Sequence, residues 1–146
     1  ADLPNIHLKI IGNGPDLEYL KTKYADKNNI VFHGFLDNFD TLNFISTSIA
    51  VITATKLYEG QPTLLCEASM LGVPSIFPDS GGIKEFFPAD YPFSYTPFDK
   101  NSLVAVIKKV ENKDIIKKTS KQSFEHISTY LEEKKLITNF EEIMNV

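Results

Sequence analysis

The chain has 146 residues, of which 42% are hydrophobic and 23% charged, a balance typical of a soluble globular protein. Its formal net charge of −4 argues against a nucleic-acid-binding protein, because such proteins usually carry an excess of basic residues on one face. No apolar stretch approaches the roughly 20 residues that span a bilayer, and the single cysteine cannot form an intrachain disulfide, so the composition suits the cytoplasm.

The first part of the chain alternates strand-like runs with segments of helical period. Strands are predicted at 6–11 and 29–35, and helices at 16–25 and 39–46. The first strand ends at the loop Gly12-Asn13-Gly14, which by itself is more typical of a plain turn than of a binding loop. The stretch from Asp37 to Asp40 lacks the spacing of a metal-binding Asp-x-Asp pair and indicates a helix start.

The second part continues the alternation. Strands are predicted at 48–54, 73–77 and 93–95, and helices at 62–71, 80–87, 102–110 and 115–144. The run at 48–54 is almost entirely apolar, as in a strand covered on both faces. Strands separated by helices need crossover connections, so the fold class is predicted as α/β, a parallel sheet with helices on both faces. No linker or repeat interrupts the pattern, and residues 1–146 are predicted to form one domain.

The loop after the third predicted strand is the candidate site, because ligands of open parallel sheets bind at the carboxyl ends of strands. Pro62 fits the first turn of the next helix, and Gly60 lets the backbone come close to a ligand. The free amides of Thr63, Leu64 and Leu65 are then expected to point outward at the positive end of that helix. Such amides form an anion site suited to a phosphate group.

Two glutamates flank this helix start. Glu67 lies among apolar residues of the predicted helix, where a carboxylate is costly unless it has partners. It is either a solvent-facing residue at the helix edge or an acceptor for two adjacent hydroxyls, such as those of a ribose. Glu59 lies eight residues earlier, on the loop, and can face the same crevice.

The spacing of Glu59 and Glu67 matches the EX7E motif, and the segment resembles the group-1 (family 4) retaining glycosyltransferases of the GT-B fold. Further family motifs are matched in order: IVGxGP by 8–15, V-x-F-x-G by 29–35, GxPVI by 71–76 and GGxxE by 81–85. The resemblance implies the C-terminal, donor-binding half of such an enzyme, with a Rossmann-like sheet.

The resemblance also implies a role for each matching position. Glu59 would be the catalytic residue, in contact with hydroxyls of the donor sugar, and Glu67 would hold the ribose. The other implied donor-binding positions are Gly12, Asn13, Gly14, Gly34, Phe35, Gly60, Gln61, Pro62, Thr63 and Leu64. No metal or cofactor is implied beyond the UDP- or GDP-sugar substrate, because fixed hydrogen-bond donors would stabilise the leaving diphosphate.

Compared with the family, the chain begins after the first strand and helix, which carry an arginine and a lysine for the diphosphate. Their absence is expected to leave a gap in the sheet or an altered pairing. The acceptor-binding N-terminal domain is also absent, so the 146 residues alone are expected to hold the donor without completing the reaction.

The function predicted for the whole protein is transfer of a sugar from a nucleotide-diphospho-sugar to a glycan or lipid-linked acceptor, in bacterial surface-polysaccharide synthesis. A non-catalytic sugar-nucleotide-binding or partner domain on the same scaffold is the alternative. The lysines at 108, 109, 113, 117, 118 and 121 are typical of a solvated helix face, with peripheral contact to an anionic membrane as the second interpretation.

Overall fold

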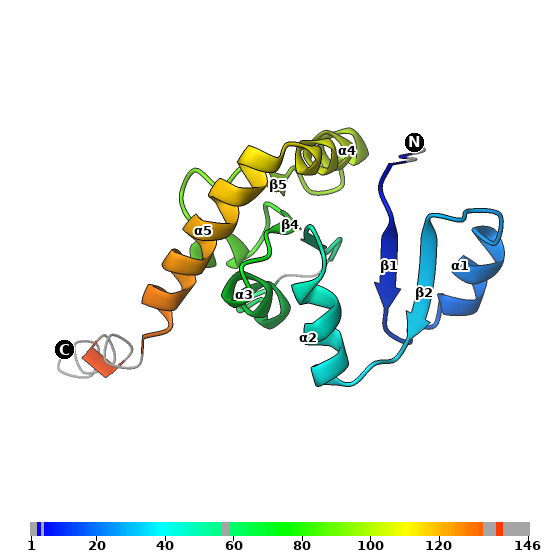
Figure 1. The fold of residues 1–146 in the computed structure, drawn as a ribbon, viewed down its shortest axis with the longest axis horizontal. Coiled ribbons are helices and arrows are strands. Elements are labelled where there is room, and N and C mark those ends of the chain that lie inside the picture. Colours follow the sequence, from blue (N-terminus) through cyan, green and yellow to red (C-terminus); the bar gives the residue numbers. More distant parts are fainter. Residues whose placement is uncertain (1–2, 4, 57–58, 133–136, 139–146) are drawn as a thin grey trace. The chain divides into compact units, whose positions relative to one another are not determined.

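The computed structural model describes residues 3, 5–56, 59–132 and 137–138. These residues belong to two compact units, Ala1–Phe44 and Ile45–Val146 (Figure 1). Each unit combines parallel strands with helices, which confirms the predicted α/β class. The prediction of one domain over 1–146 stays a prediction.

The first unit is built on two strands. Its elements are β1 (Leu8–Ile11), α1 (Leu17–Lys23), β2 (Ile30–Gly34) and the start of α2 (Asn38–Ser46). β1 and β2 pair in parallel from Leu8 opposite Ile30, with a shift in register after Ile10. None of the described residues of this unit is fully buried, so its two strands and one helix do not enclose a core.

Two local predictions for the first unit are confirmed. The helix over 16–25 appears as α1, and its half-buried positions include Leu17 and Leu20, as the apolar spacing requires. The helix start at Asp37 is also present, because its Oδ1 accepts a 2.8 Å hydrogen bond from the backbone N–H of Asp40.

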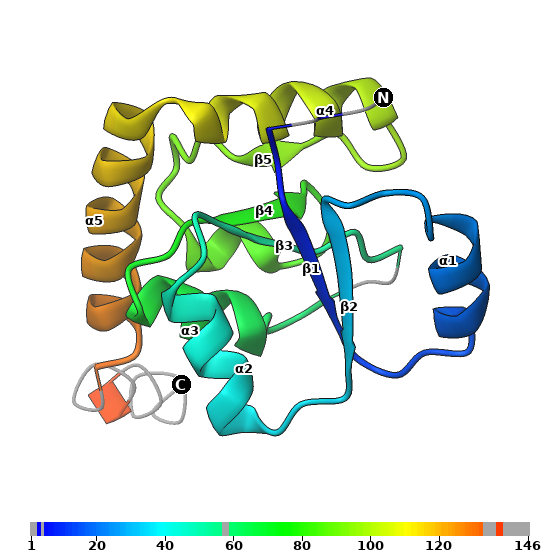
Figure 2. The ribbon, with the colours of Figure 1, turned by 45° about the vertical axis from the view of Figure 1, so that its right-hand side comes forward.

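The second unit holds the larger sheet. Its elements are β3 (Val51–Ile52), α3 (Thr63–Met70), β4 (Ser75–Pro78), η1 (Ile83–Phe86), β5 (Ser94–Tyr95), α4 (Lys100–Lys108), η2 (Lys109–Glu111) and α5 (Lys113–Tyr130). The strands pair in parallel in the order β3-β4-β5, and all four residues of β4 are buried. Figures 1 and 2 show α4 beside β5 and α5 beside α3, so helices pack against this sheet and one another.

Two expectations for the second unit are corrected. The strand predicted over 48–54, covered on both faces, is limited to β3, whose residues are half-buried and which pairs, among the described strands, with β4. The helix predicted over 80–87 is the short 3₁₀ helix η1. Gly81 precedes it with a φ of 62°, and Pro88 holds Phe87 in an extended conformation, so a longer helix has no room.

The parallel strands pair as two separate sheets, β1-β2 and β3-β4-β5. The first sheet belongs to the first unit and the second sheet to the second unit, and the expected gap or altered pairing stays a prediction. The last predicted helical region, 115–144, contains α5, while residues 133–136 and 139–146 lie outside the described part of the chain.

The core of the second unit is aromatic around β4. Tyr91 is buried, and its hydroxyl donates to the carbonyl of Ser75 and accepts from the N–H of the same residue, each at 2.7 Å. The ring stacks on Phe77 at 5.3 Å and lies 4.6 Å from the ring of Phe87. Tyr91 therefore satisfies both backbone groups of the first residue of β4.

Candidate functional site

The candidate site begins after the carboxyl end of β3. Residues 57 and 58 lie outside the described chain, and Glu59 and Gly60 are the first described residues of the loop that leads into α3. Glu59 is half-buried and Gly60 is exposed. The loop after β4 meets this segment, because the N–H of Gly82 donates a 3.0 Å hydrogen bond to the carbonyl of Glu59.

The glycine pair Gly81-Gly82 allows this close approach. A Cβ on Gly81 would lie 2.6 Å from the carbonyl oxygen of Glu59, and one on Gly82 would lie 3.2 Å from that of Gly60. Gly81 also has a φ of 62°, which side chains disfavour. The contact fixes the backbone of Glu59 from a loop more than 20 residues away in the sequence, so Gly81 and Gly82 belong to the site as supporting residues.

The start of α3 corrects one part of the sequence prediction. Pro62 is buried and precedes the first helical residue instead of lying in the first turn. The N–H of Thr63 donates to the carbonyl of Gln61 at 3.1 Å, and that of Leu65 to the carbonyl of Pro62 at 2.9 Å. The prediction of three free amides is therefore wrong for Thr63 and Leu65, because the tight turn at 61–63 brings carbonyl groups back to them. Within the described chain, only Leu64 of the three keeps an N–H without a hydrogen-bond partner.

Glu67 occupies the second turn of α3. It is half-buried and follows Cys66, a free cysteine that is buried as the apolar run around it predicts. Burial raises the pKa of the Cys66 thiol, and the nearby charge of Glu67 adds to the rise. Among the described residues, no cationic side chain lies within ion-pair distance of Glu59 or Glu67. Both carboxylates are thus available to external hydrogen-bond donors.

The remaining predicted site residues lie in the first unit. The N–H of Gly12 donates to the carbonyl of Gly34 at 2.7 Å, and both glycines have positive φ angles, of 127° and 70°. The Oδ1 atom of Asn13 lies 3.4 Å from where a Cβ on Gly34 would be, so these three residues come together. Gly14 accepts a hydrogen bond from the N–H of Leu17, and Phe35 is 73% exposed.

The loop after β4 also carries an ion pair that the sequence did not single out. Lys84 Nζ lies 2.5 Å from an oxygen of Asp79, and both side chains are partly exposed. The pair links the end of β4 to η1 across the glycine turn. Among the described residues, no group of three or more His, Cys, Asp or Glu side chains is placed to hold a metal ion.

The fold is α/β, with the candidate site on loops that follow the carboxyl ends of parallel strands. The chain belongs to the glycosyl transferases group 1 family, whose model matches residues 1–133. In the part of the chain that is described, no helix is long and apolar enough to cross a membrane.

Three similar proteins illustrate the extent of the match. Protein CapJ of Staphylococcus aureus is 27% identical over 97% of this chain, which spans 38% of CapJ. HepE of Anabaena, solved with UDP-glucose, aligns with a TM-score of 0.76 and 16% identity, over 97% of this chain and 41% of HepE. The C-terminal domain of the group 1 glycosyl transferase LpcC of Francisella tularensis aligns with a TM-score of 0.71 and 18% identity, over 88% of this chain and 71% of that domain. The two solved structures share the fold.

Proposed function

We propose that this chain is the donor-binding part of a retaining glycosyltransferase that moves a sugar from a nucleotide-diphospho-sugar to a glycan or lipid-linked acceptor. The family supports transfer of a glycosyl group, and HepE, which shares the fold, was solved with UDP-glucose. The EX7E resemblance supports the retaining outcome, and surface-polysaccharide synthesis stays a prediction. Reaction would require the acceptor-binding half of the protein.

One observation carries the proposal: two half-buried carboxylates without cationic partners flank a helix start at the carboxyl edge of the β3-β4-β5 sheet. A carboxylate accepts hydrogen bonds only, so Glu59 and Glu67 suit hydroxyl-rich ligands. The Leu64 N–H at the positive end of α3 suits a phosphate oxygen.

The roles follow from position. Glu67 accepts from the ribose hydroxyls, and Glu59 accepts from hydroxyls of the donor sugar. Leu64 and the exposed backbone of Gly60 and Gln61 face the diphosphate, where fixed donors stabilise the charge of the leaving group. The contacts assigned by resemblance to Gly12, Asn13, Gly14, Gly34 and Phe35 stay predictions.

The ribose role is tested by titrating UDP and GDP into the wild-type chain and the Glu67→Gln variant. Loss of a charged acceptor is expected to weaken binding of the preferred nucleotide by roughly 10- to 100-fold. Glu59→Gln should leave nucleotide affinity within about twofold and weaken only the binding of the sugar nucleotide, because Glu59 is assigned to the sugar.

Glu125→Gln, the same chemical change on α5, serves as the matched control and should bind like wild type. Equal affinity of wild type and Glu67→Gln for the preferred nucleotide would remove the ribose role. Failure of the full-length protein to bind either nucleotide would remove the donor-binding function. Donor binding without sugar transfer by the full-length protein would leave the non-catalytic alternative.

A further inference from the structure

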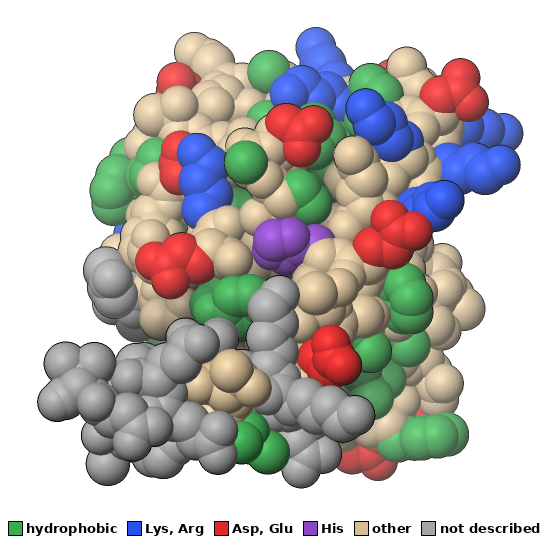
Figure 3. Space-filling view, turned by 90° about the vertical axis from the view of Figure 1, so that its left-hand side faces the viewer, with side chains coloured by type: hydrophobic (Ala, Val, Ile, Leu, Met, Phe, Trp, Pro, Cys, Tyr) green, Lys and Arg blue, Asp and Glu red, His purple; other side chains and the backbone are tan. Residues whose placement is uncertain are grey.

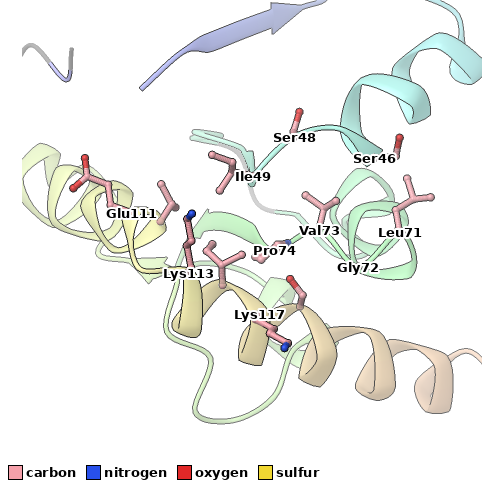
Figure 4. Close-up of a pocket in the computed structure, with 13 residues that line it drawn as sticks. Ser46, Ser48, Ile49, Leu71, Gly72, Val73, Pro74, Glu111, Lys113 and Lys117 are labelled. Atoms are coloured by element: carbon pink, nitrogen blue, oxygen red, sulfur yellow. The ribbon is translucent and has the colours of Figure 1, made fainter. Parts of the chain in front are cut away.

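The second unit has a pocket at the opposite end of its sheet from the candidate site. Its volume is about 420 Å³, and it is lined by residues just before β3 and β4, by Val110 and the carboxylate residue Glu111 of η2, and by the start of α5 (Figure 4). Ile49 precedes β3, and Val73 and Pro74 precede β4, so the pocket opens at the amino ends of the strands. A partner bound there would leave the loops at the carboxyl ends uncovered.

The rim of this pocket exposes apolar side chains. Ile49 is 62% exposed and Leu71 is 42% exposed, whereas Val73 and Pro74 behind them are buried. Met70, beside Leu71, is likewise exposed at the end of α3. Neighbouring exposed apolar side chains on a polar face are typical of an interaction surface.

Two lysines complete the pocket from α5. Lys113 and Lys117 are four residues apart, so they lie on the same side of the helix, and Figure 4 shows both on α5 among the residues that line the pocket. Among the described residues, neither has a carboxylate within ion-pair distance. Lys113 also lies in the first turn of α5, where the helix dipole disfavours a positive charge.

Positive charge extends beyond the pocket. Lys121 continues the spacing of Lys113 and Lys117 along α5, although its Nζ lies 3.8 Å from a carboxylate oxygen of Glu125. Residues 100–132 contain seven lysines and four acidic residues, although the whole chain has a net charge of −4. Figure 3 shows one side of the molecule, on which lysine side chains gather in the upper half with acidic side chains among them.

We propose that the pocket and its rim on the second unit dock on the surface of an anionic phospholipid membrane. Lys113 and Lys117 bind lipid phosphate groups, and Ile49 and Leu71 enter the interface between the head groups and the acyl chains. An acidic peptide is the alternative partner, because its carboxylates would pair with the two lysines of the pocket. The lysines are spread along α5, and apolar side chains project from the rim. Both features favour a broad partner such as a membrane over a peptide bound in the pocket. The inference does not rest on the proposed sugar transfer, since it uses the other end of the sheet.

The experiment measures co-sedimentation of the chain with phosphatidylcholine vesicles, with and without about 30% phosphatidylglycerol, at about 0.1 M salt. Binding is expected only with phosphatidylglycerol. The double variant Lys113→Gln/Lys117→Gln should bind about 25-fold more weakly, because each lysine near an anionic surface contributes about fivefold. Ile49→Ser should also weaken binding while keeping the salt dependence of the wild type.

The matched control is Lys21→Gln/Lys23→Gln, which removes two lysines from α1 and should bind like wild type. Absence of wild-type binding to the anionic vesicles would overturn the proposal. An equal loss of vesicle binding in the α5 double variant and the α1 double variant would also overturn it. Inorganic phosphate is expected to compete no better than chloride at the same ionic strength. Specific competition by phosphate would assign the pocket to a small anion, and binding of an acidic peptide in place of vesicles would assign it to a protein partner.

Discussion

At the residue scale, four glycines and one phenylalanine of the described residues have positive φ angles. The phenylalanine, Phe98, has a φ of 62° and is 81% exposed. It occupies the third position of a turn closed by a 3.1 Å hydrogen bond from the N–H of Asp99 to the carbonyl of Thr96, with Pro97 at the second position. Turns of this kind favour glycine at the third position.

Phe98→Gly is expected to stabilise the protein by roughly 0.5–1 kcal/mol, because relief of backbone strain exceeds the added entropy of glycine in the unfolded chain. Little burial is lost, since the ring is exposed. Urea denaturation measures the change, with Phe98→Ala as the control that keeps the strain and should not gain stability. A loss of stability in the glycine variant would contradict the strain argument.

Gly81 differs from Phe98, because here the native residue is already the glycine that a positive φ favours. Gly81→Ala is expected to destabilise the second unit by roughly 1–3 kcal/mol, because the new Cβ would collide with the Glu59 carbonyl and disfavour the positive φ. Urea denaturation again supplies the measurement. Gly60→Ala is the control: no atom lies within 4 Å of its Cβ position, so its stability should stay within about 0.5 kcal/mol of wild type. Equal effects of the two substitutions would show that Gly81 does not support the loop.

At the scale of elements, α3 packs against α5. Thr119, Ser123 and Ile127 are the buried residues of α5 and recur every four positions, so they lie on one face of the helix. The Oγ atom of Ser128 on α5 lies 3.6 Å from the Sδ atom of Met70 at the end of α3. Leu65, Cys66, Ala68 and Ser69 of α3 are buried, whereas Glu67 between them is half-buried.

Because of the contact between Tyr91 and β4, the free energy of unfolding is expected to fall at alkaline pH. Burial raises the pKa of the Tyr91 hydroxyl well above its usual value near 10. The neutral hydroxyl is therefore favoured in the folded state, and its stabilising effect is complete below about pH 10 and lost as the pH rises further. Urea midpoints between about pH 8 and pH 11 should fall with pH, and more steeply for wild type than for Tyr91→Phe. Identical pH profiles would contradict this role of Tyr91.

At the scale of the whole molecule, the chain divides into two units of unequal internal packing. All the buried residues of the described chain belong to the second unit, which contains the predicted carboxylate pair. The first unit contains the predicted glycine loop and Phe35, and its two-stranded sheet is too small for a core of its own. Charge is also uneven, since residues 100–132 are basic in an acidic chain.

Much of the fold was predictable, because strands, helices and their ends depend on local patterns. Apolar periodicity predicted α1 and α2, and Gly72, with a φ of 70°, ends the helical region that it predicted over 62–71. The length of β3 was overestimated, because an apolar run shows that a segment is buried without showing how many of its residues pair. The amide pattern at 61–65 was also beyond prediction, since the path of one tight turn decides which N–H groups stay free.

The sequence by itself determined the order of strands and helices and the spacing of Glu59 and Glu67, because both depend on neighbouring residues. Only the tertiary structure decided that Gly81 and Gly82 hold the Glu59 loop, that Leu64 alone of three amides is free within the described chain, and that Ile49, Leu71 and Lys113 share one pocket. These features bring together segments far apart in the chain. Their distances are set by how the sheet and helices pack, and no local pattern encodes that packing.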